Sequence, residues 1–391
     1  MFSLQVLHNR EQFERLAPEW RELLKSSASD GLFLTWEWLF TWWQHLAGNR
    51  RLWLVVLREG RDLAAVAPLT LRLRQPRRLL PFRVLEFLGG GNVGSDYLDL
   101  IAARGTEQAV IAKLGDYLAD QKLVLELSRI RPQAIGMGLL AALRSREYKI
   151  SERGHSEVCP YINLESLTWE SYLANLGAAH RYNVRRRLRN LARSFKLQFD
   201  QARSQAECDA WLPLLIALHR KRWDGRRQTS TAFCQPELGA FHREFTALAL
   251  QRGWLRLQLL RLNDAPAAAL YGLNYAGVFY FYQSGFDPTF SRHSIGLATM
   301  ALTIRSAIAE GAREFDMLHG EEEYKFLWTR QVRQMSHCIV FPPGMRGVLC
   351  RRIVRLRERL KHLVRRQPRP VFAGSGMAQL ARPLAHPPRA E

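Results

Sequence analysis

The chain has 391 residues, a length that suits two or three domains, and its 47% hydrophobic and 24% charged residues are typical of globular proteins. It contains 57 Lys and Arg against 36 Asp and Glu, a formal net charge of +21. This excess indicates an anionic partner such as nucleic acid, a nucleotide-sugar, coenzyme A or an anionic membrane face, although an arginine-rich genome would produce part of it.

Several classes of protein are not expected. No apolar run approaches the ~20 residues of a membrane span, and residues 1–9 lack the pattern of a signal peptide. The five cysteines are scattered and have no C-x-x-C spacing. We therefore expect a reducing cytoplasm, with no disulfide framework and no metal site.

The first half of the chain alternates strand and helix patterns. The expected strands are 2–7, 52–57, 63–71, 84–88, 95–100, 123–127 and 148–152, and the expected helices are 10–25, 34–46, 108–118 and 133–144. The helix at 34–46 contains four tryptophans, which favours a buried core over a lid above a cleft. The glycine-rich run 89–94 predicts a loop.

The same order then starts again. The expected strands are 158–164, 196–199, 254–262, 267–275, 278–283, 314–318 and 336–341, and the expected helices are 168–176, 180–195, 202–218 and one that begins at 293–298 and ends at Gly311. Turn residues at 284–288 are expected to end the strand 278–283. The pattern predicts two copies of one α/β fold, although no sequence repeat proves a duplication.

The C-terminal region is basic. From Leu349 an apolar stripe continues through Ile353, Leu356, Leu360 and Leu363, and eight Arg and Lys residues surround it. Such a helix lies on an anionic membrane, covers a groove in its own protein or binds a partner helix. We expect domains at 1–155 and 156–344, a basic amphipathic helix at 345–367 and a disordered tail at 368–391.

Two arginine-rich stretches are candidates for binding an anion. The stretch 180–196, which contains the helix expected at 180–195, holds seven Arg and Lys residues and no acid, so it is either a solvated surface or a site for a phosphate-bearing substrate or RNA. Arg222 and Trp223 follow at the end of another helix. They either bind a phosphate and stack on a base or sugar, or they only cap that helix.

The stretch 278–328 has the strongest pattern. Strand, glycine-bearing loop, helix and strand can aim backbone N–H groups at a phosphate, although a glycine near a helix start is also a common cap. The segment 319–325 follows the last strand, which carries Asp316. Acylation needs a base, oxyanion donors and an acid: His319 or a glutamate could be the base, Tyr324 the acid, and Lys325 a neutralising cation.

His293-x-x-Gly296-x-Ala298 resembles the acyl-CoA-binding segment of the GNAT acetyltransferase superfamily, where Gln or Arg is usual at the position of His293. Further matches extend from about residue 20 to 328: Trp36-Glu37-Trp38, residues 95–100, Arg222-Trp223, residues 282–287 and residues 315–325. Together they resemble the CelD-type (cellulose-biosynthesis) acetyltransferase-like family, which is related to the FemABX aminoacyltransferases. Ile295 stands where that family tends to have proline.

The resemblance implies an α/β (α+β) tandem GNAT fold, with two mixed sheets flanked by helices, the acyl donor in the second domain and the acceptor at the cleft between domains. The implied catalytic residues are Asp316, Tyr324, Lys325 and His319. The implied donor-binding residues are Gln283, Arg292, His293, Ser294, Gly296, Leu297 and Ala298. The expected acceptor-binding residues are Asp96, Tyr97, Arg185, Arg222 and Trp223.

We therefore expect a cytoplasmic acyltransferase that moves an acyl group from acetyl-CoA or another acyl-CoA to an amine or hydroxyl of a cell-envelope or exopolysaccharide precursor. Two alternatives stay open. One is aminoacyl transfer from charged tRNA, as in FemABX relatives. The other is a catalytically inactive scaffold that the helix 349–366 holds on the inner membrane face.

Overall fold

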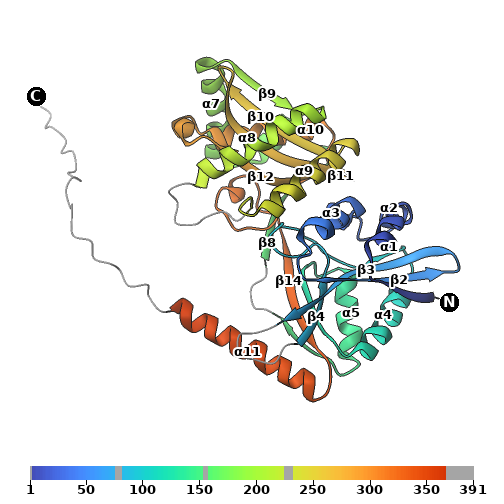
Figure 1. The fold of residues 1–391 in the computed structure, drawn as a ribbon. Coiled ribbons are helices and arrows are strands. Elements are labelled where there is room, and N and C mark those ends of the chain that lie inside the picture. Colours follow the sequence, from blue (N-terminus) through green and yellow to red (C-terminus); the bar gives the residue numbers. More distant parts are fainter. Residues whose placement is uncertain (1, 75–81, 153–156, 224–231, 367–391) are drawn as a thin grey trace, which may run out of the picture.

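The structure, a computed structural model, describes residues 2–74, 82–152, 157–223 and 232–366, with the side chains of the last helix described up to Leu356. The chain forms two halves, the N-terminal half below and the C-terminal half above in Figure 1. The tail expected at 368–391 lies outside the described residues. Among the described residues, no helix has the length and apolarity needed to cross a membrane.

The N-terminal half is a mixed sheet with helices beside it. Its strands are β1 (Phe2–Leu7), β2 (Arg51–Glu59), β3 (Asp62–Arg74), β4 (Phe82–Phe87), β5 (Ile101–Ala102), β6 (Val124–Ile130) and β7 (Lys149–Glu152). Its helices are α1 (Arg10–Arg15), α2 (Ala17–Lys25), α3 (Trp36–Leu46), α4 (Glu107–Gln121) and α5 (Ile135–Arg144). The strands β1 to β4 pair antiparallel in sequence order, and β6 pairs parallel with β4. Helices α4 and α5 pack side by side (Figure 1).

The C-terminal half repeats this arrangement. Its strands are β8 (Glu157–Asn163), β9 (Leu197–Gln201), β10 (Leu255–Leu262), β11 (Ala265–Tyr275), β12 (Val278–Phe286) and β13 (Glu314–Asp316). Its helices are α6 (Trp169–Asn175), α7 (Ala178–Ser194), α8 (Gln205–Trp223), α9 (Pro236–Gln251) and α10 (Ile295–Ala309). The strands β10 to β12 pair antiparallel, and β13 pairs parallel with β12. In both halves, therefore, three antiparallel strands precede a helix and a parallel strand, which confirms the predicted fold.

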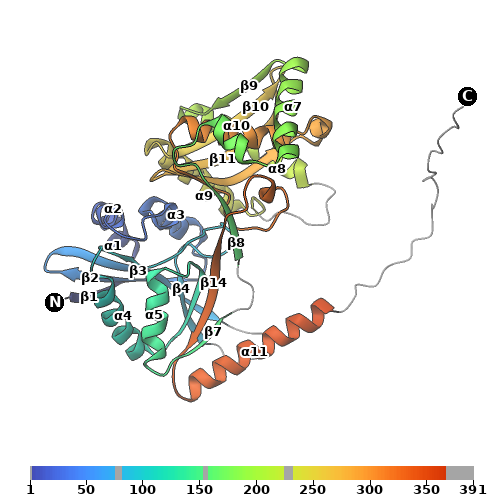
Figure 2. The same ribbon diagram turned by 180° about the vertical axis from the view of Figure 1, so that it is seen from behind.

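The last strand, β14 (Val332–Phe341), joins the two halves. Its first residues, Val332–Met335, pair with β8, and its later residues pair with β6 and β7. The strands consequently form one continuous path through the molecule, along which β14 is a long connecting element (Figure 2). The expected second domain, 156–344, contains all of β14, whereas residues 336–341 hydrogen-bond to strands of the N-terminal half.

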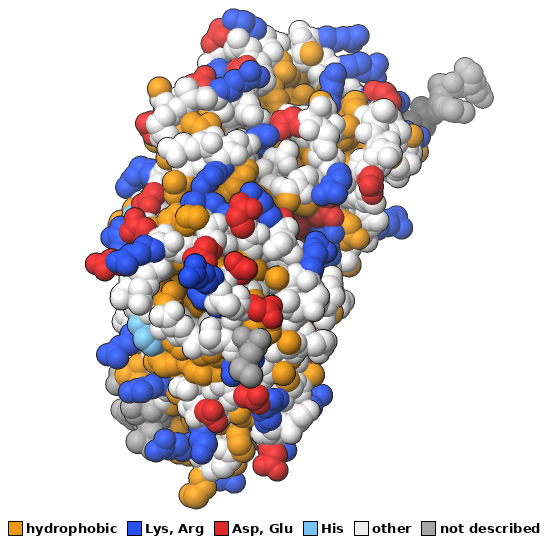
Figure 3. Space-filling model, turned by 90° about the vertical axis from the view of Figure 1, so that its right-hand side faces the viewer, with side chains coloured by type: hydrophobic (Ala, Val, Ile, Leu, Met, Phe, Trp, Pro, Cys, Tyr) orange, Lys and Arg blue, Asp and Glu red, His pale blue; other side chains and the backbone are white. Residues whose placement is uncertain are grey.

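The surface carries positive charge in many places. On the face shown in Figure 3, Lys and Arg side chains are spread over both halves, with Asp and Glu side chains between them. The net charge of +21 is therefore not gathered into a single patch on this face.

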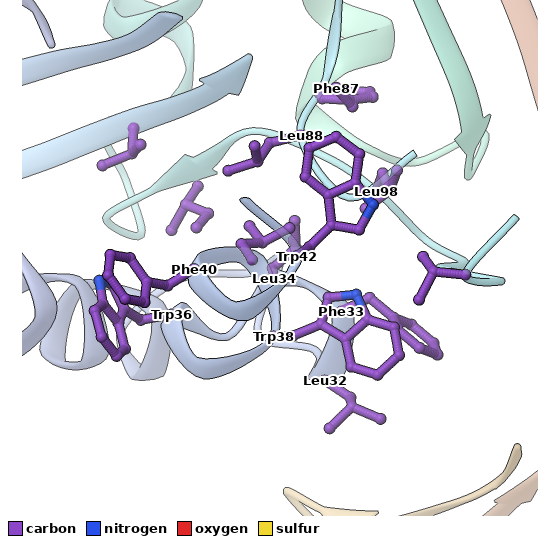
Figure 4. Close-up of a cluster of buried hydrophobic side chains, with 14 of the residues drawn as sticks. Leu32, Phe33, Leu34, Trp36, Trp38, Phe40, Trp42, Phe87, Leu88 and Leu98 are labelled. Atoms are coloured by element: carbon purple, nitrogen blue, oxygen red, sulfur yellow. The ribbon is translucent and has the colours of Figure 1, made fainter. Parts of the chain in front are cut away.

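The tryptophans of α3 belong to the core, as the sequence predicts. Trp36, Trp38 and Trp42 are at most 8% exposed, and Figure 4 shows them among other buried apolar side chains. The ring of Trp38 also lies 4.9 Å from that of Phe241 in α9 and 5.6 Å from that of Tyr282 in β12. One apolar core thus runs across the boundary between the halves, which fixes their relative position.

Two expectations about strands are wrong. Residues 95–100 are not a strand, because Tyr97 has a positive φ of 57° and the Asp99 carboxylate accepts from the backbone N–H groups of Ile135 and Gly136 at the start of α5. The strand 278–283 does not end at Ser284, since Ser284 and Gly285 stay paired with β11. Helix α9 was not expected from the sequence at all.

Candidate active site

The strands β12 and β13 separate at the centre of the C-terminal half. They pair only over Val278–Tyr280 and Glu314–Asp316, after which β13 ends while β12 continues to Phe286. Opposite β11, Tyr271 faces Gln283 and Gly272 faces Phe281, so Tyr282 is an extra residue in a β-bulge. Because bulges redirect backbone and side-chain groups, they are common beside active sites. The separation leaves an opening at residues 281–284.

Two pockets meet at this opening. The first has a volume of about 280 Å³, lies between β11, β12 and α10, and is mostly apolar; its lining includes Leu270, Phe286, Leu297, Met300, Leu327 and Trp328. The second has a volume of about 180 Å³ and is more polar; its lining includes Gly94, His219, Trp223, Gln283, His319, Glu322 and Lys325. Arg222, Phe281, Ser284 and Tyr324 line both pockets. The site can therefore hold two different groups, one in each pocket, that meet at the opening.

Helix α10 begins at the edge of the first pocket. It follows a 3-10 turn, η2 (Pro288–His293), and its preceding residue Ser294 makes no side-chain cap. The first hydrogen bond within the helix runs from the N–H of Ala298 to the carbonyl of Ser294, so the N–H groups of Ile295, Gly296 and Leu297 have no partner within the helix. Gly296 and Leu297 line the pocket. A helix start of this kind suits a phosphate group.

The other expected donor-binding residues are placed differently. Gln283 lines the second pocket rather than the first. Arg292 and His293 lie at the end of η2, where Nε of Arg292 is 3.1 Å from Nε2 of His293. Ala298 is fully buried and belongs to the apolar cluster behind the helix, so its side chain faces the core rather than the pocket.

A buried carboxylate of the N-terminal half holds His319. The Asp96 side chain is 0% exposed and accepts from the backbone N–H of His319 at 2.8 Å, and Nδ1 of the His319 ring lies 3.0 Å from the same oxygen. Arg129 donates to the other Asp96 oxygen at 3.2 Å and lies 3.4 Å from Nε2 of His319. Burial acts to raise the pKa of Asp96, but the interactions with His319 and Arg129 outweigh it and lower that pKa.

These contacts define the state of the His319 ring. An ionised carboxylate only accepts hydrogen bonds, so Nδ1 carries a proton toward Asp96. A guanidinium only donates, so its approach to Nε2 fits an unprotonated nitrogen there. The His319 side chain is 36% exposed and lines the second pocket. Nε2 has one lone pair, which faces Arg129, so a group bound in the second pocket gives its proton to this nitrogen by displacing the Arg129 contact.

Asp316 lies behind the pockets and lines neither of them. It is 1% exposed, and it accepts from the backbone N–H of Leu318 and the hydroxyl of Tyr97, both at 2.8 Å. Burial raises the pKa of Asp316 to about 6. Arg333 also contacts this carboxylate, at 3.2 Å. The geometry gives Asp316 the role of fixing the turn that carries His319 and the loop that carries Tyr97.

Lys325 and Tyr324 complete the second pocket. The Lys325 ammonium is almost fully buried and donates to the carbonyls of Leu318 and His319, at 3.2 and 2.8 Å, and pairs with Glu322 at 3.0 Å. Burial is the main cause that raises the pKa of Tyr324 to about 12, with Glu322 adding to the effect and Arg222 opposing it. Tyr324 therefore keeps its phenolic proton at neutral pH and can donate it.

The expected acceptor-binding residues separate into two groups. Arg222 donates to the Ser284 hydroxyl at 2.9 Å, and its guanidinium carbon is 5.7 Å from the centre of the Tyr324 ring. Trp223 lines the second pocket beside it. Arg185 lines neither pocket, since it lies on α7 and pairs with Glu170 at 2.7 Å.

Sequence reasoning missed two contributions to the site. Gly94 brings the glycine-rich loop of the N-terminal half to the second pocket, within reach of the His319 ring. The run of glycines was a usable signal for a close approach of backbone. Arg129, which has a positive φ of 58°, has no local signal, because its role comes only from contacts with Asp96 and His319.

The arginine-rich helix α7 lies beside the start of α10. It packs against both α10 and η2, and Arg187 donates to the Arg292 carbonyl at 3.3 Å. Arg181, Arg185 and Arg189 line an open groove of about 610 Å³ on α7 together with Tyr182. The phosphate-suited helix start therefore adjoins a basic surface.

Comparisons with known proteins agree with this geometry. Residues 178–326 match the family model described as an acetyltransferase (GNAT) domain. The crystal structure of FemX is similar with a TM-score of 0.58 at 9% identity, over 87% of this chain and 97% of that chain. The C-terminal domain (DUF2156) of a putative lysylphosphatidylglycerol synthetase from Agrobacterium fabrum is similar with a TM-score of 0.51 at 10% identity, over 88% of this chain and 96% of that chain. A search of curated proteins finds no match.

These similarities define the class of fold. At 9% and 10% identity the two solved structures show a common architecture and nothing finer. The match at 178–326 begins at α7 and ends at Phe326. It contains all the residues that line the two pockets except Leu327 and Trp328 of the first pocket and Gly94 of the second. The chain thus has a GNAT-type acyltransferase fold, and the site described above lies where the family model matches.

Proposed function

We propose that the protein is an acyltransferase that moves an acyl group from acyl-CoA to an amine or hydroxyl acceptor by direct attack. One observation carries this proposal: an apolar pocket at an uncapped helix start and a polar pocket at His319 meet at the separated strands. Direct transfer needs donor and acceptor held on opposite sides of one reacting carbon.

The residues of the first pocket fit the donor. The N–H groups of Ile295, Gly296 and Leu297, which have no partner within the helix, would hold the pyrophosphate, with Arg292 adding positive charge. The apolar lining suits the pantetheine arm. Backbone amides of the bulged segment Tyr282–Ser284 would bind the developing oxyanion, and Arg222 lies at the same place through its bond to Ser284.

The second pocket supplies the proton transfers. Nε2 of His319 would take the proton from the attacking acceptor as the new bond to the acyl carbon forms, while Asp96 holds the ring. Tyr324 would give its proton to the thiolate as the carbon–sulfur bond breaks. Lys325 keeps the His319 backbone in place through its two carbonyl contacts. The products are the acylated acceptor and free CoA thiol.

The acceptor is the less defined partner. We infer from the CelD-type resemblance that it is a precursor of cell-envelope or exopolysaccharide material, met in the cytoplasm. The second pocket has a polar lining that includes Trp223, and this supports the choice because an indole ring can stack on a sugar ring.

Thiol release from acetyl-CoA in the presence of a panel of amino sugars and sugar alcohols would test the function. We expect acceptor-dependent release by the wild type and a fall in kcat on the order of 10²-fold or more in His319→Gln, because a general base contributes about that much. Substitution of the distant exposed His8, as His8→Gln, is the control. Equal rates in His319→Gln and the wild type would contradict the mechanism.

A second candidate is aminoacyl transfer from charged tRNA, which the basic groove on α7 beside α10 favours. Binding of tRNA should fall steeply with salt and weaken in Arg181→Glu/Arg189→Glu, whereas acetyl-CoA binding should not need this groove. Tight, salt-dependent tRNA binding together with no binding of any CoA would replace the first proposal by this one.

A further inference from the structure

Helix α11 (Met345–Arg366) is held against the N-terminal half by one of its faces. Cys350 and Val354 are buried in a small apolar cluster with strand residues that include Val84 and Phe341, and Ile353 on the same helix is also buried. A Cβ on Gly347 would lie 1.7 Å from the carbonyl oxygen of Pro342, so only glycine allows the helix to turn back this closely after β14. The helix runs along the lower edge of the molecule (Figures 1 and 2).

The opposite face of α11 exposes apolar side chains. Met345, Val348, Leu349 and Leu356 are 90%, 53%, 45% and 51% exposed, four of the nine large exposed apolar side chains among the described residues. At 3.6 residues per turn, Met345 and Val348 fall opposite Cys350 and Val354, whereas Leu349 and Leu356 lie on the flank of the helix next to Ile353. The apolar stripe expected from the sequence is therefore buried only in part, since Ile353 is buried whereas Leu349 and Leu356 are exposed to solvent.

Arginines accompany the exposed apolar face. Arg346, Arg352 and Arg355 are exposed and Arg351 is partly so. None of these four guanidinium groups has an ion-pair partner among the described residues, and the sequence 345–366 contains a single acid, Glu358, against nine Arg and Lys residues. Apposition of two such faces from two copies of the chain would bring unpaired positive charges together, which disfavours self-association.

We propose that the outer face of α11 docks flat on an anionic lipid surface. The apolar side chains enter the boundary between headgroups and acyl chains, and Arg351, Arg352 and Arg355 meet lipid phosphates, whereas Arg346 lies one helical turn before Cys350 on the inner side. The inner face stays packed on the sheet while the outer face is on the membrane. The helix therefore holds the folded N-terminal half directly at the membrane surface rather than through a flexible linker. This inference is independent of the proposed acyl transfer.

Co-sedimentation of the full chain with vesicles tests this proposal. We expect binding to phosphatidylcholine vesicles that contain phosphatidylglycerol, little binding to phosphatidylcholine alone, and weaker binding at high salt. Leu349→Ser/Leu356→Ser and Arg352→Glu/Arg355→Glu should each lower the partition coefficient on the order of tenfold or more. Thermal unfolding of each variant checks that it is folded.

Matched control variants outside α11 show whether any change in vesicle binding comes from the helix or only from a lower exposed apolar area or net charge. Leu73→Ser removes an equally exposed leucine from β3, and Arg51→Glu/Arg61→Glu changes the net charge by the same amount elsewhere. Both should bind vesicles like the wild type. The proposal is overturned if the wild type does not bind anionic vesicles. It is also overturned if Arg51→Glu/Arg61→Glu lowers the partition coefficient as much as Arg352→Glu/Arg355→Glu does. A wild type that self-associates and that Leu349→Ser/Leu356→Ser converts to monomer would overturn it too.

Discussion

The ring of His319 lies 2.9 Å from the carboxylate of Asp96, although the two residues are 223 positions apart and belong to opposite halves of the molecule. A second hydrogen bond to a carboxylate also joins the two halves, because the hydroxyl of Tyr97 donates to Asp316 at 2.8 Å. The loop after β4 therefore enters the site of the C-terminal half. There it holds the turn 317–319 in place. The proposed reaction depends on both halves being present.

Asp96→Asn should lower kcat/KM on the order of 10²-fold or more, because an amide can donate to Nδ1 and favour the wrong tautomer of His319. The measurement is kcat/KM of the variant and the wild type with acetyl-CoA and an active acceptor. Asp30→Asn is the control, since Asp30 also bonds across the halves, to Tyr275 at 2.6 Å, but lines neither pocket. A similar loss in both variants would mean that only the packing of the halves matters.

Gly285→Ala should destabilise the protein by about 2–3 kcal/mol, because a Cβ there would lie 2.2 Å from the backbone nitrogen of His219 in α8. Chemical unfolding of the variant and the wild type gives the difference directly. In Gly239→Ala, a helical control in α9, the nearest atom to the new Cβ is the end of a flexible Arg243 side chain at 3.8 Å, so no loss is expected. Unchanged stability in Gly285→Ala would show that α8 is not so closely packed on β12.

Asp316 should make stability fall as pH rises. Burial raises its pKa from 3.8 to about 6, so the folded state holds this proton more tightly than the unfolded state. The resulting stabilisation is complete below about pH 4 and is lost as pH rises through about 6. Relative to Asp316→Asn, the wild type should lose up to about 3 kcal/mol of unfolding free energy between pH 4 and 7. Urea unfolding across this range measures it, and a difference that is flat or grows with pH would be incompatible with the assignment.

Local patterns were sufficient to predict most elements. The strand 278–283, the helix after Gly296 and the short strand before Met317 each follow from residues close in sequence, and the structure contains all three. Helix α9 also has a local signal in the sequence: Pro236 stands in its first turn, and Leu238, Phe241 and Phe245, all three buried, recur at helical spacing.

The interior of the site could not be predicted in the same way. Residues 95–100 alternate like a strand, but their carboxylates turn inward: Asp96 meets His319, and Asp99 caps α5. Arg129 joins Asp96 from 33 positions away. The contact of Asp96 with His319 arises only when the two halves pack together, and the other two pairings join residues more than 30 positions apart within the N-terminal half, so no spacing in the sequence reports them.

Calorimetric titration with acetyl-CoA and free CoA tests the central claim, that the first pocket and the start of α10 hold the donor. We expect binding by the wild type and by Gly296→Ala, whose new methyl group would lie 3.4 Å from the Phe286 ring, an ordinary contact. Gly296→Glu should bind at least tenfold more weakly, because it places a carboxylate where the pyrophosphate is expected. Absence of binding by the wild type, or equal binding by Gly296→Glu, would contradict the account.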